Sequence, residues 1–386
     1  MTRLGDGCRP LTLVVVAVLV TACAGGPVLA NPPAQRPTPS VAVTPAPSPA
    51  HDPQPIVVPR DDAPHDRLTE WWYYTGHLRD AHGRRFGFEF VIFRAERGTF
   101  PVAWAAHFAI TDEGGHRFVY TQRSEVGAQV DRRTADGLRD GFDFALEGTT
   151  DATTTWALTG ANGIDRVVGS FAPDQASDNT STVSLALDLR STKPAALHDG
   201  DGWVDFGPAG GSYYYSRTRM AASGELTLDG RRLSVDGEAW FDHQWGDFIA
   251  VGGGGWDWFA INLDDGTDLT LSLVRDQEGN YPLVYGTLVD ADGKTHHLDR
   301  EAFAVDVLGH WTSPASGVRY PSKWRVSVPS EHLVVDLTPT VAAQELDTRA
   351  TSGVIYWEGS QRVRATRSGK SLGGEAYVEL TGYRPG

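Results

Sequence analysis

Cysteine is almost absent from this sequence. Its 386 residues include two cysteines, Cys8 and Cys23, and both lie near the N-terminus. The rest of the chain therefore cannot form a disulfide or a thiolate metal site. Positive charge is also scarce, because 34 basic residues are outnumbered by 49 acidic ones and the formal net charge is −15. Since phosphate contacts require a positive surface, we expect no nucleic-acid partner.

Long apolar runs are missing too, apart from the ten residues Leu11–Val20. This run is too short to span a bilayer and has the length of a signal-peptide core. It leads into Val20-Thr21-Ala22-Cys23, which resembles a bacterial lipobox, where the cysteine becomes the lipidated first residue of the mature protein. The alternative is an ordinary secretory signal cleaved near Ala30. The lipobox predicts a signal peptide over residues 1–22, a lipid on Cys23 and a protein anchored to the membrane of the bacterial cell envelope.

The next segment is rich in proline. Residues 24–55 hold ten prolines mixed with alanine, serine and threonine. Such a composition cannot bury enough apolar surface to fold, and proline keeps it extended. We therefore predict a disordered tether over residues 23–55.

The remaining residues are patterned as β-strands. The chain has 43 glycines and 12 tryptophans, and Arg85–Phe93 carries an almost unbroken aromatic face. Turn signals recur between such runs, for example Asp229-Gly230 and Asp265-Gly266. Short strands at this spacing predict an all-β fold of sandwiches or barrels.

An internal repeat divides the folded part. Trp71–Leu78 aligns with Trp256–Leu263 at an offset of 185 residues, and the strands that follow end at Arg94 and Arg275, 181 residues apart. Two copies of one β unit would explain this, although aromatic strands also match by chance. We predict units at residues 56–225 and 226–386, with the boundary near 221–230.

The stretch EAWFDHQWGD, residues 238–247, concentrates reactive side chains. Alternate residues of a strand share a face, so Phe241, His243 and Trp245 should lie opposite Trp240, Asp242 and Gln244. His243 beside Trp245 suits a general base next to a cation-stabilising ring. Asp242 and His243 could instead cap the end of a barrel.

Other aromatic residues are candidates for a ligand site. Trp256 and Trp258 should share a face, with the acid Asp257 opposite them. Tyr213 and Tyr215 also alternate along a strand. Together with Trp72, these aromatic residues either line an apolar pocket or pack as core and rim.

Three carboxylates lie inside aromatic strands, namely Glu70, Glu358 and Glu379. For such residues we expect a buried carboxylate paired with an arginine such as Arg217 or Arg219, because an unpaired buried charge is costly.

Familiar cofactor and metal motifs are missing. His296-His297 lacks the spacing of a zinc site, and the sequence has neither a Gly-x-Ser-x-Gly elbow nor a P-loop. We therefore expect no cofactor and no metal.

Six motifs occur in an order that resembles a known family, the AttH-like family, which includes the carotenoid 1,2-hydratases (hydroxyneurosporene synthases). The resemblance spans residues 60–386 and rests on Glu70–Leu78, Ser212–Ser216, Ala239–Gly246, Gly255–Phe259, Tyr356–Gly359 and Tyr377–Tyr383. It implies two lipocalin-like β-barrels in tandem, which agrees with the repeat.

The resemblance also implies candidate catalytic residues. The family's hydratases carry a His-x-Trp pair, matched by His243 and Trp245, and a Tyr-x-Asp pair. At the second pair this chain has Leu271 and Ser272, neither of which is a useful acid. Asp257 and Asp268 are the substitutes that the sequence offers.

Three functions follow from the sequence. The first is a lipid-anchored protein that binds an elongated apolar molecule, such as an isoprenoid or an acyl chain. The second is a hydratase that adds water to a terminal C=C bond of an acyclic carotenoid. The third is an accessory module with a partner in an envelope transport system.

Overall fold

The computed structural model describes residues 52–133, 140–147, 155–248 and 253–385. The predicted signal peptide, the predicted lipidation site Cys23 and all but the last four residues of the predicted tether lie outside these residues. Within them, no helix is both long and apolar enough to cross a membrane.

The first half of the described chain forms one antiparallel sheet. Its strands follow the order β4-β3-β2-β1-β12-β11-β8-β7-β6-β5, with β9 and β10 paired to β11. The bounds are β1 (Thr69–Asp80), β2 (Arg85–Ala95), β3 (Ala103–Asp112), β4 (Arg117–Val126), β5 (Phe142–Leu146), β6 (Trp156–Ala161), β7 (Ile164–Phe171), β8 (Val183–Ser191), β9 (Ala196–Leu197), β10 (Trp203–Asp205), β11 (Gly211–Leu228) and β12 (Arg231–Gly246).

The second half forms a second antiparallel sheet. Its order is β16-β15-β14-β13-β23-β21-β19-β18-β17, with β20 and β22 paired to β21. The bounds are β13 (Gly253–Leu263), β14 (Asp268–Asp276), β15 (Leu283–Val289), β16 (Thr295–Leu298), β17 (Ala304–Thr312), β18 (Arg319–Val328), β19 (Leu333–Pro339), β20 (Glu345–Asp347), β21 (Ile355–Arg367), β22 (Lys370–Leu372) and β23 (Gly374–Leu380). Short 3-10 helices are η1 (Arg60–Asp62), η2 (Ala128–Val130), η4 (Gly207–Ala209), η5 (Arg300–Ala302) and η6 (Pro329–Glu331).

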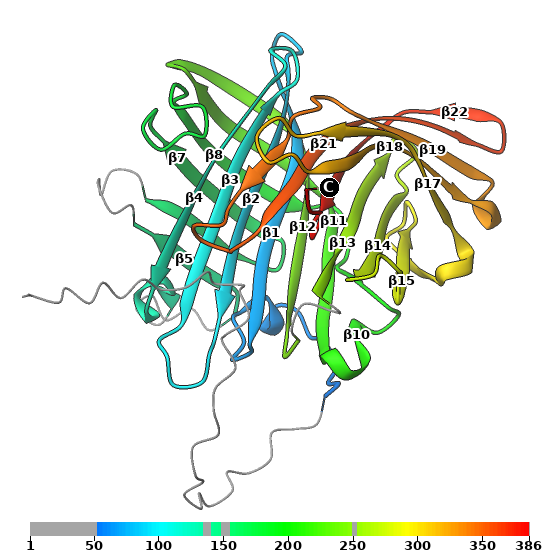
Figure 1. Cartoon of the computed structure of the whole chain (residues 1–386), viewed down its shortest axis with the longest axis horizontal. Coiled ribbons are helices and arrows are strands. Elements are labelled where there is room, and N and C mark those ends of the chain that lie inside the picture. Colours follow the sequence, from blue (N-terminus) through cyan, green and yellow to red (C-terminus); the bar gives the residue numbers. More distant parts are fainter. Residues whose placement is uncertain (1–51, 134–139, 148–154, 249–252, 386) are drawn as a thin grey trace, which may run out of the picture.

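The two sheets repeat one topology. In each, the first strand is central and pairs with the last, β1 with β12 and β13 with β23, and the next three strands continue outward from the first. Each sheet curls into a lipocalin-like barrel (Figure 1). The aligned stretches Trp71–Leu78 and Trp256–Leu263 lie in β1 and β13, the equivalent strands. The all-β fold with two tandem barrels is confirmed.

The predicted boundary between the units needs correction. Residue 225 lies inside β11, and β11 continues through the turn at Asp229-Gly230 into β12. β12 belongs to the first sheet, because it pairs with β1 from Thr69 to Asp80. The chain passes to the second sheet between residues 246 and 253. The Asp-Gly turn that suggested a boundary is a hairpin turn within the first barrel.

Each barrel is filled by its own apolar core. The first contains the aromatic face predicted for β2, Phe86, Phe88 and Phe90, all fully buried. The second is built around Trp324 and Trp357. At about 25 cal/mol per Å² of apolar surface removed from water, these side chains supply much of the driving force for folding.

The barrels also bury surface against each other. β1 lies against β23 and β2 against β21, so that the second sheet covers one face of the first in Figure 1. Asp268 of β14 anchors this contact. Its carboxylate lies 2.7 Å from Lys193 Nζ and 2.7 Å from Arg219 Nη2 of the first unit. Most of β1 and residues 239–246 of β12 are therefore buried on both faces.

Candidate functional site

The stretch 238–247 forms the end of β12, and its side chains alternate as predicted. Phe241 and Trp245 belong to the core of the first barrel, and His243 stacks there on Trp72. On the opposite face, Trp240 packs between the two barrels, and Asp242 borders a cavity there. The stretch thus contributes to two environments.

The cavity between the barrels has a volume of about 800 Å³. This lies within the roughly 300–1,000 Å³ of small-molecule sites. Its floor comes from the outer faces of β1, β2, β11 and β12, and its opposite wall from β13, β14, β21 and β23. Aromatic side chains line both the floor and the wall of the cavity, namely Trp71, Tyr73, Phe93, Phe206, Tyr214, Tyr285, Phe248, Trp256, Trp258, Tyr356 and Tyr383.

Asp242 of β12 places a carboxyl group at the floor of this cavity. Tyr214 Oη donates to Asp242 Oδ2 at 2.6 Å, Trp240 Nε1 donates to Oδ1 at 2.6 Å, and the Ser216 hydroxyl also donates to Oδ1. Burial of the side chain raises the pKa of Asp242 to about 6, although these donors favour the ionised form. A carboxyl group with such a pKa exchanges its proton near neutral pH.

Glu379 of β23 places a second carboxyl group there. Trp256 Nε1 donates to Glu379 Oε2 at 2.9 Å. Burial raises the pKa of Glu379 to about 7; the Trp256 hydrogen bond opposes this shift, and the charge of Asp242 adds to it. Two acids with raised pKa values therefore share one aromatic cavity, which is a common arrangement at functional sites.

Two further glutamates are buried behind the wall. Tyr73 Oη donates to Glu358 Oε1 at 2.8 Å, and Tyr356 Oη donates to Glu89 Oε1 at 2.7 Å. Burial raises the pKa of Glu89 to about 8 and that of Glu358 well above its ordinary value. These acids are therefore largely neutral at pH 7.

The arginine partners predicted for Glu358 and Glu379 are wrong. Within the described residues, no lysine, arginine or histidine lies within ion-pair distance of either carboxylate. Arg217 instead pairs with Asp62 at 2.7 Å, and Arg219 pairs with the carboxylate at the start of β14. The side chains that reach Glu358 and Glu379 are tyrosine and tryptophan, which donate hydrogen bonds but carry no positive charge. A bound proton, rather than a neighbouring cation, therefore neutralises these carboxyl groups.

The ligand-binding candidates divide between the two environments. Trp256 and Trp258 line the cavity, whereas Tyr213, Tyr215 and Trp72 point into the core of the first barrel. Their sequence neighbours Tyr214 and Trp71 line the cavity instead. The alternation of these strands was predicted, but the face that meets the cavity was not.

The predicted substitute acids are engaged elsewhere. Asp257 points into the second barrel, opposite the two tryptophans, where Tyr383 Oη donates to it at 3.0 Å and Arg275 Nε lies 3.3 Å away. Burial raises the pKa of Asp257 to about 6, and Arg275 opposes that shift. Asp268 is held by Lys193 and Arg219. Ser272 does lie on the cavity wall.

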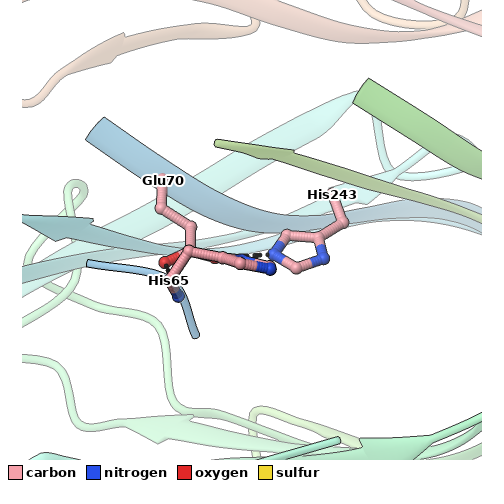
Figure 2. Close-up of side chains that lie close together, drawn as sticks. All are labelled: His65, Glu70 and His243. Carbon is pink, nitrogen blue, oxygen red and sulfur yellow. Dashed lines mark hydrogen bonds and ion pairs between the residues drawn. The ribbon is translucent and has the colours of Figure 1, made fainter. Parts of the chain in front are cut away.

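His243 and Trp245 lie in a second polar cluster, inside the first barrel. Glu70 Oε1 is 2.9 Å from His243 Nε2 and 2.8 Å from His65 Nδ1 (Figure 2). The His65 ring stacks on Trp245 with centroids 4.1 Å apart. Within the described residues, neither His243 nor Trp245 borders the cavity.

The charges of this cluster are coupled. Burial alone would raise the pKa of Glu70, but His65 and His243 hold it below its ordinary value. Burial lowers the pKa of His243. The pKa of His65 is raised, because Glu70 and Asp61 outweigh the effect of burial. Arg94, the arginine nearest to Glu70, is 3.9 Å away.

Two lipocalin-like barrels in tandem, with an acid-bearing aromatic cavity between them, define the structural class of this protein. The chain belongs to the AttH-like family, whose model matches residues 49–383. This confirms the resemblance seen in the sequence. No curated protein sequence gives a significant match.

Two solved structures share the fold. An AttH protein from Nitrosomonas europaea is 28% identical with a TM-score of 0.72, over 86% of this chain and 98% of that one. Kievitone hydratase from Nectria haematococca is 15% identical with a TM-score of 0.60, over 85% of this chain and 93% of that one. At that identity the second likeness shows the fold alone.

Proposed function

We propose that the protein binds an elongated apolar molecule, an acyl chain or an isoprenoid, in the cavity between its barrels. The aromatic wall around about 800 Å³ is the observation that carries this proposal. Arg97, Arg349 and Arg384 also border the cavity. Arg349 is paired with Asp347 at 2.6 Å, and the positive charge of Arg97 and Arg384 favours a ligand with an anionic head group, such as a fatty acid.

A substitution that fills the cavity tests the binding. Val274 lies on the wall and is 8% exposed. Val274→Phe should weaken binding of a fluorescent polyene fatty acid by at least about tenfold, since added ring volume excludes the chain. Val307→Phe is the matched control, because Val307 is 45% exposed on β17. Equal affinity in wild type and Val274→Phe would contradict the proposal.

Hydration of a C=C bond is the second candidate function. Glu379 and Asp242 at the cavity favour it, because protonation of an alkene needs a protonated acid. Glu379, with a pKa of about 7, is partly protonated at neutral pH, whereas Asp242, with a pKa of about 6, is protonated at more acidic pH. Kievitone hydratase, a hydratase by its name, shares the fold. In this proposal the acid lies at the cavity, on β12 (Asp242) or β23 (Glu379), rather than at His243 and Trp245.

The proposed reaction requires only groups at the cavity. A protonated carboxyl group of Asp242 or Glu379 donates its proton to the less substituted carbon of the C=C bond and leaves a tertiary carbocation at the other carbon, beside Trp256 or Trp258, whose ring faces stabilise positive charge. Water adds through its oxygen, and the carboxylate takes up one water proton. One water molecule is added, and the acid is regenerated.

Incubation with an acyclic carotenoid tests this candidate. Mass spectrometry should detect the water adduct with the wild type and lose it with Asp242→Asn or Glu379→Gln. Glu301→Gln, at an exposed position on η5, is the control. Bound carotenoid without adduct would leave binding as the function and exclude hydration of that substrate.

We also propose that the protein is exported and anchored to the cell-envelope membrane through a lipid on Cys23. The apolar run that meets this cysteine supports the proposal. Mass spectrometry of the N-terminal peptide should detect the added lipid, and Cys23→Ser should abolish it.

A further inference from the structure

The interior of the first barrel holds three metal-ligating side chains whose donor atoms converge. These atoms are His65 Nδ1, Glu70 Oε1 and His243 Nε2, and all lie within 4.8 Å of one another (Figure 2). His65 precedes β1, Glu70 is the second residue of β1, and His243 lies on β12. The pairing of Glu70 with Trp245 and of Trp72 with His243 places the carboxylate and the imidazole as diagonal neighbours on one face.

The remaining polar atoms of the three side chains have partners of their own. His65 Nε2 lies 3.7 Å from Asp61 Oδ1, and His243 Nδ1 lies 3.4 Å from Tyr215 Oη. Glu70 Oε2 accepts the His65 backbone N–H at 2.9 Å. Ligating histidines in metal sites ordinarily have a carboxylate or other polar group at the second ring nitrogen. His65 has such a partner in Asp61, and His243 has one in Tyr215.

Aromatic packing holds both imidazoles in place. His65 lies parallel to Trp245, with 2° between the rings, and Trp72 stacks on His243 at 4.6 Å. Glu70 and His243 are fully buried, whereas the His65 side chain is 22% exposed. The cluster is therefore preorganised, and it can be approached from solvent on the side of His65.

We propose that His65, Glu70 and His243 bind a divalent transition-metal ion of the zinc class. Two imidazoles and one carboxylate are a common ligand set for such ions, and they leave a coordination position for water. The site does not depend on the ligand proposed for the cavity.

The geometry requires a small adjustment. Bonds of about 2.0–2.1 Å in a tetrahedral site place ligand atoms roughly 3.3 Å apart. The observed oxygen-to-nitrogen distances are 2.8 and 2.9 Å. Glu70 would withdraw by about half an ångström as the ion replaces its hydrogen bonds to the imidazoles, and the two imidazole nitrogens, which lie within 4.8 Å of each other, would also take up this separation. The bound ion would then tie the segment before β1 to β1 and β12.

Zinc titration of the full mature chain, stripped of metal by a chelator, tests the proposal. Calorimetry should give one zinc per chain. His65→Gln and Glu70→Gln should each weaken binding by at least about tenfold, and the outer-shell variant Asp61→Asn by about 10–100-fold. His297→Gln is the matched control, because His297 lies near Asp199 and Asp299 on the second barrel's side.

The variants and a second measurement distinguish the outcomes. His65→Gln alters a partly exposed side chain before β1 and should remain folded by circular dichroism. In the wild type, cobalt should give the visible absorption of a nitrogen- and oxygen-ligated ion, and zinc should displace it. Absence of binding, binding that survives His65→Gln, or loss of binding in His297→Gln would each overturn the assignment.

Discussion

The carboxyl group of Asp242 should make the stability of the protein depend on pH. Asp242 is 3% exposed, and burial raises its pKa from 3.8 to about 6. The folded state therefore holds this proton more tightly than the unfolded state does. Its contribution to stability is complete below about pH 3.8 and is lost as the pH rises to about 6.

The size of the effect follows from the two pKa values. One pKa unit corresponds to about 1.36 kcal/mol, so a rise of about two units corresponds to about 3 kcal/mol. Asp242→Asn has nearly the same shape but no ionisation. The difference in the free energy of unfolding between wild type and Asp242→Asn should therefore fall by roughly 2 kcal/mol between pH 4 and pH 6.5, and by the full value of about 3 kcal/mol only over a wider range, from about pH 3 to about pH 7. Any cost of placing the amide among three donors is independent of pH and leaves this slope unchanged.

Urea unfolding at several pH values measures the difference. Wild type, Asp242→Asn and the exposed control Glu301→Gln should be compared at pH 4, 5, 6 and 7 with the same ionic strength. The control should follow the wild-type profile. A difference between wild type and Asp242→Asn that stays constant over this range would refute the idea that Asp242 is a buried, proton-holding acid.

The remaining predictions concern stability. Trp72→Ala should cost about 3–5 kcal/mol in urea unfolding, because Trp72 is fully buried among aromatic rings of the first barrel; a cost below about 1 kcal/mol would contradict its place in the core. Asp268→Ala should cost a similar amount, because it leaves Lys193 and Arg219 without their buried partner. Asp336→Ala, which breaks a surface ion pair on the second barrel, should have little effect and serves as its comparison.

The fold could be predicted because strand alternation is a local property. The spacing of Phe86, Phe88 and Phe90 identifies an inward face without knowledge of the rest of the chain. The same holds for Trp256 and Trp258 against Asp257. The repeat at Trp71 and Trp256 then required only that two similar stretches form two similar units.

The cavity could not be predicted, because several strands are buried on both faces. Tyr213 and Tyr215 face the core of the first barrel, and Tyr214 faces the cavity, yet all three are tyrosines. Trp71 and Trp72 pose the same problem. When both faces are aromatic, the sequence cannot tell which one meets the second barrel, and that depends on how the barrels dock.

The cluster in the first barrel depends on contacts across most of the first unit. His65 and Glu70 are separated from His243 by more than 170 residues, so no local spacing relates them. Pairing of β1 with β12 brings them together. The same pairing explains the misplaced boundary, since an Asp-Gly turn has the same sequence whether it joins two strands of one sheet or two units.

β12 is the wall between the two candidate sites. Asp242 faces the cavity, and His243, the next residue, faces the first barrel, since successive side chains of a strand point to opposite sides. Burial beside aromatic side chains raises the pKa of a carboxyl group such as that of Asp242. An imidazole can form a hydrogen bond with a buried carboxylate such as that of Glu70. The acid, the imidazole and the two indoles of Trp240–Trp245 thus do not form one catalytic constellation. Asp242 and Trp240 contact groups on the cavity side of the sheet, and His243 and Trp245 contact groups inside the first barrel. The pairing of β12 with both β1 and β11 fixes the positions of both sets of side chains.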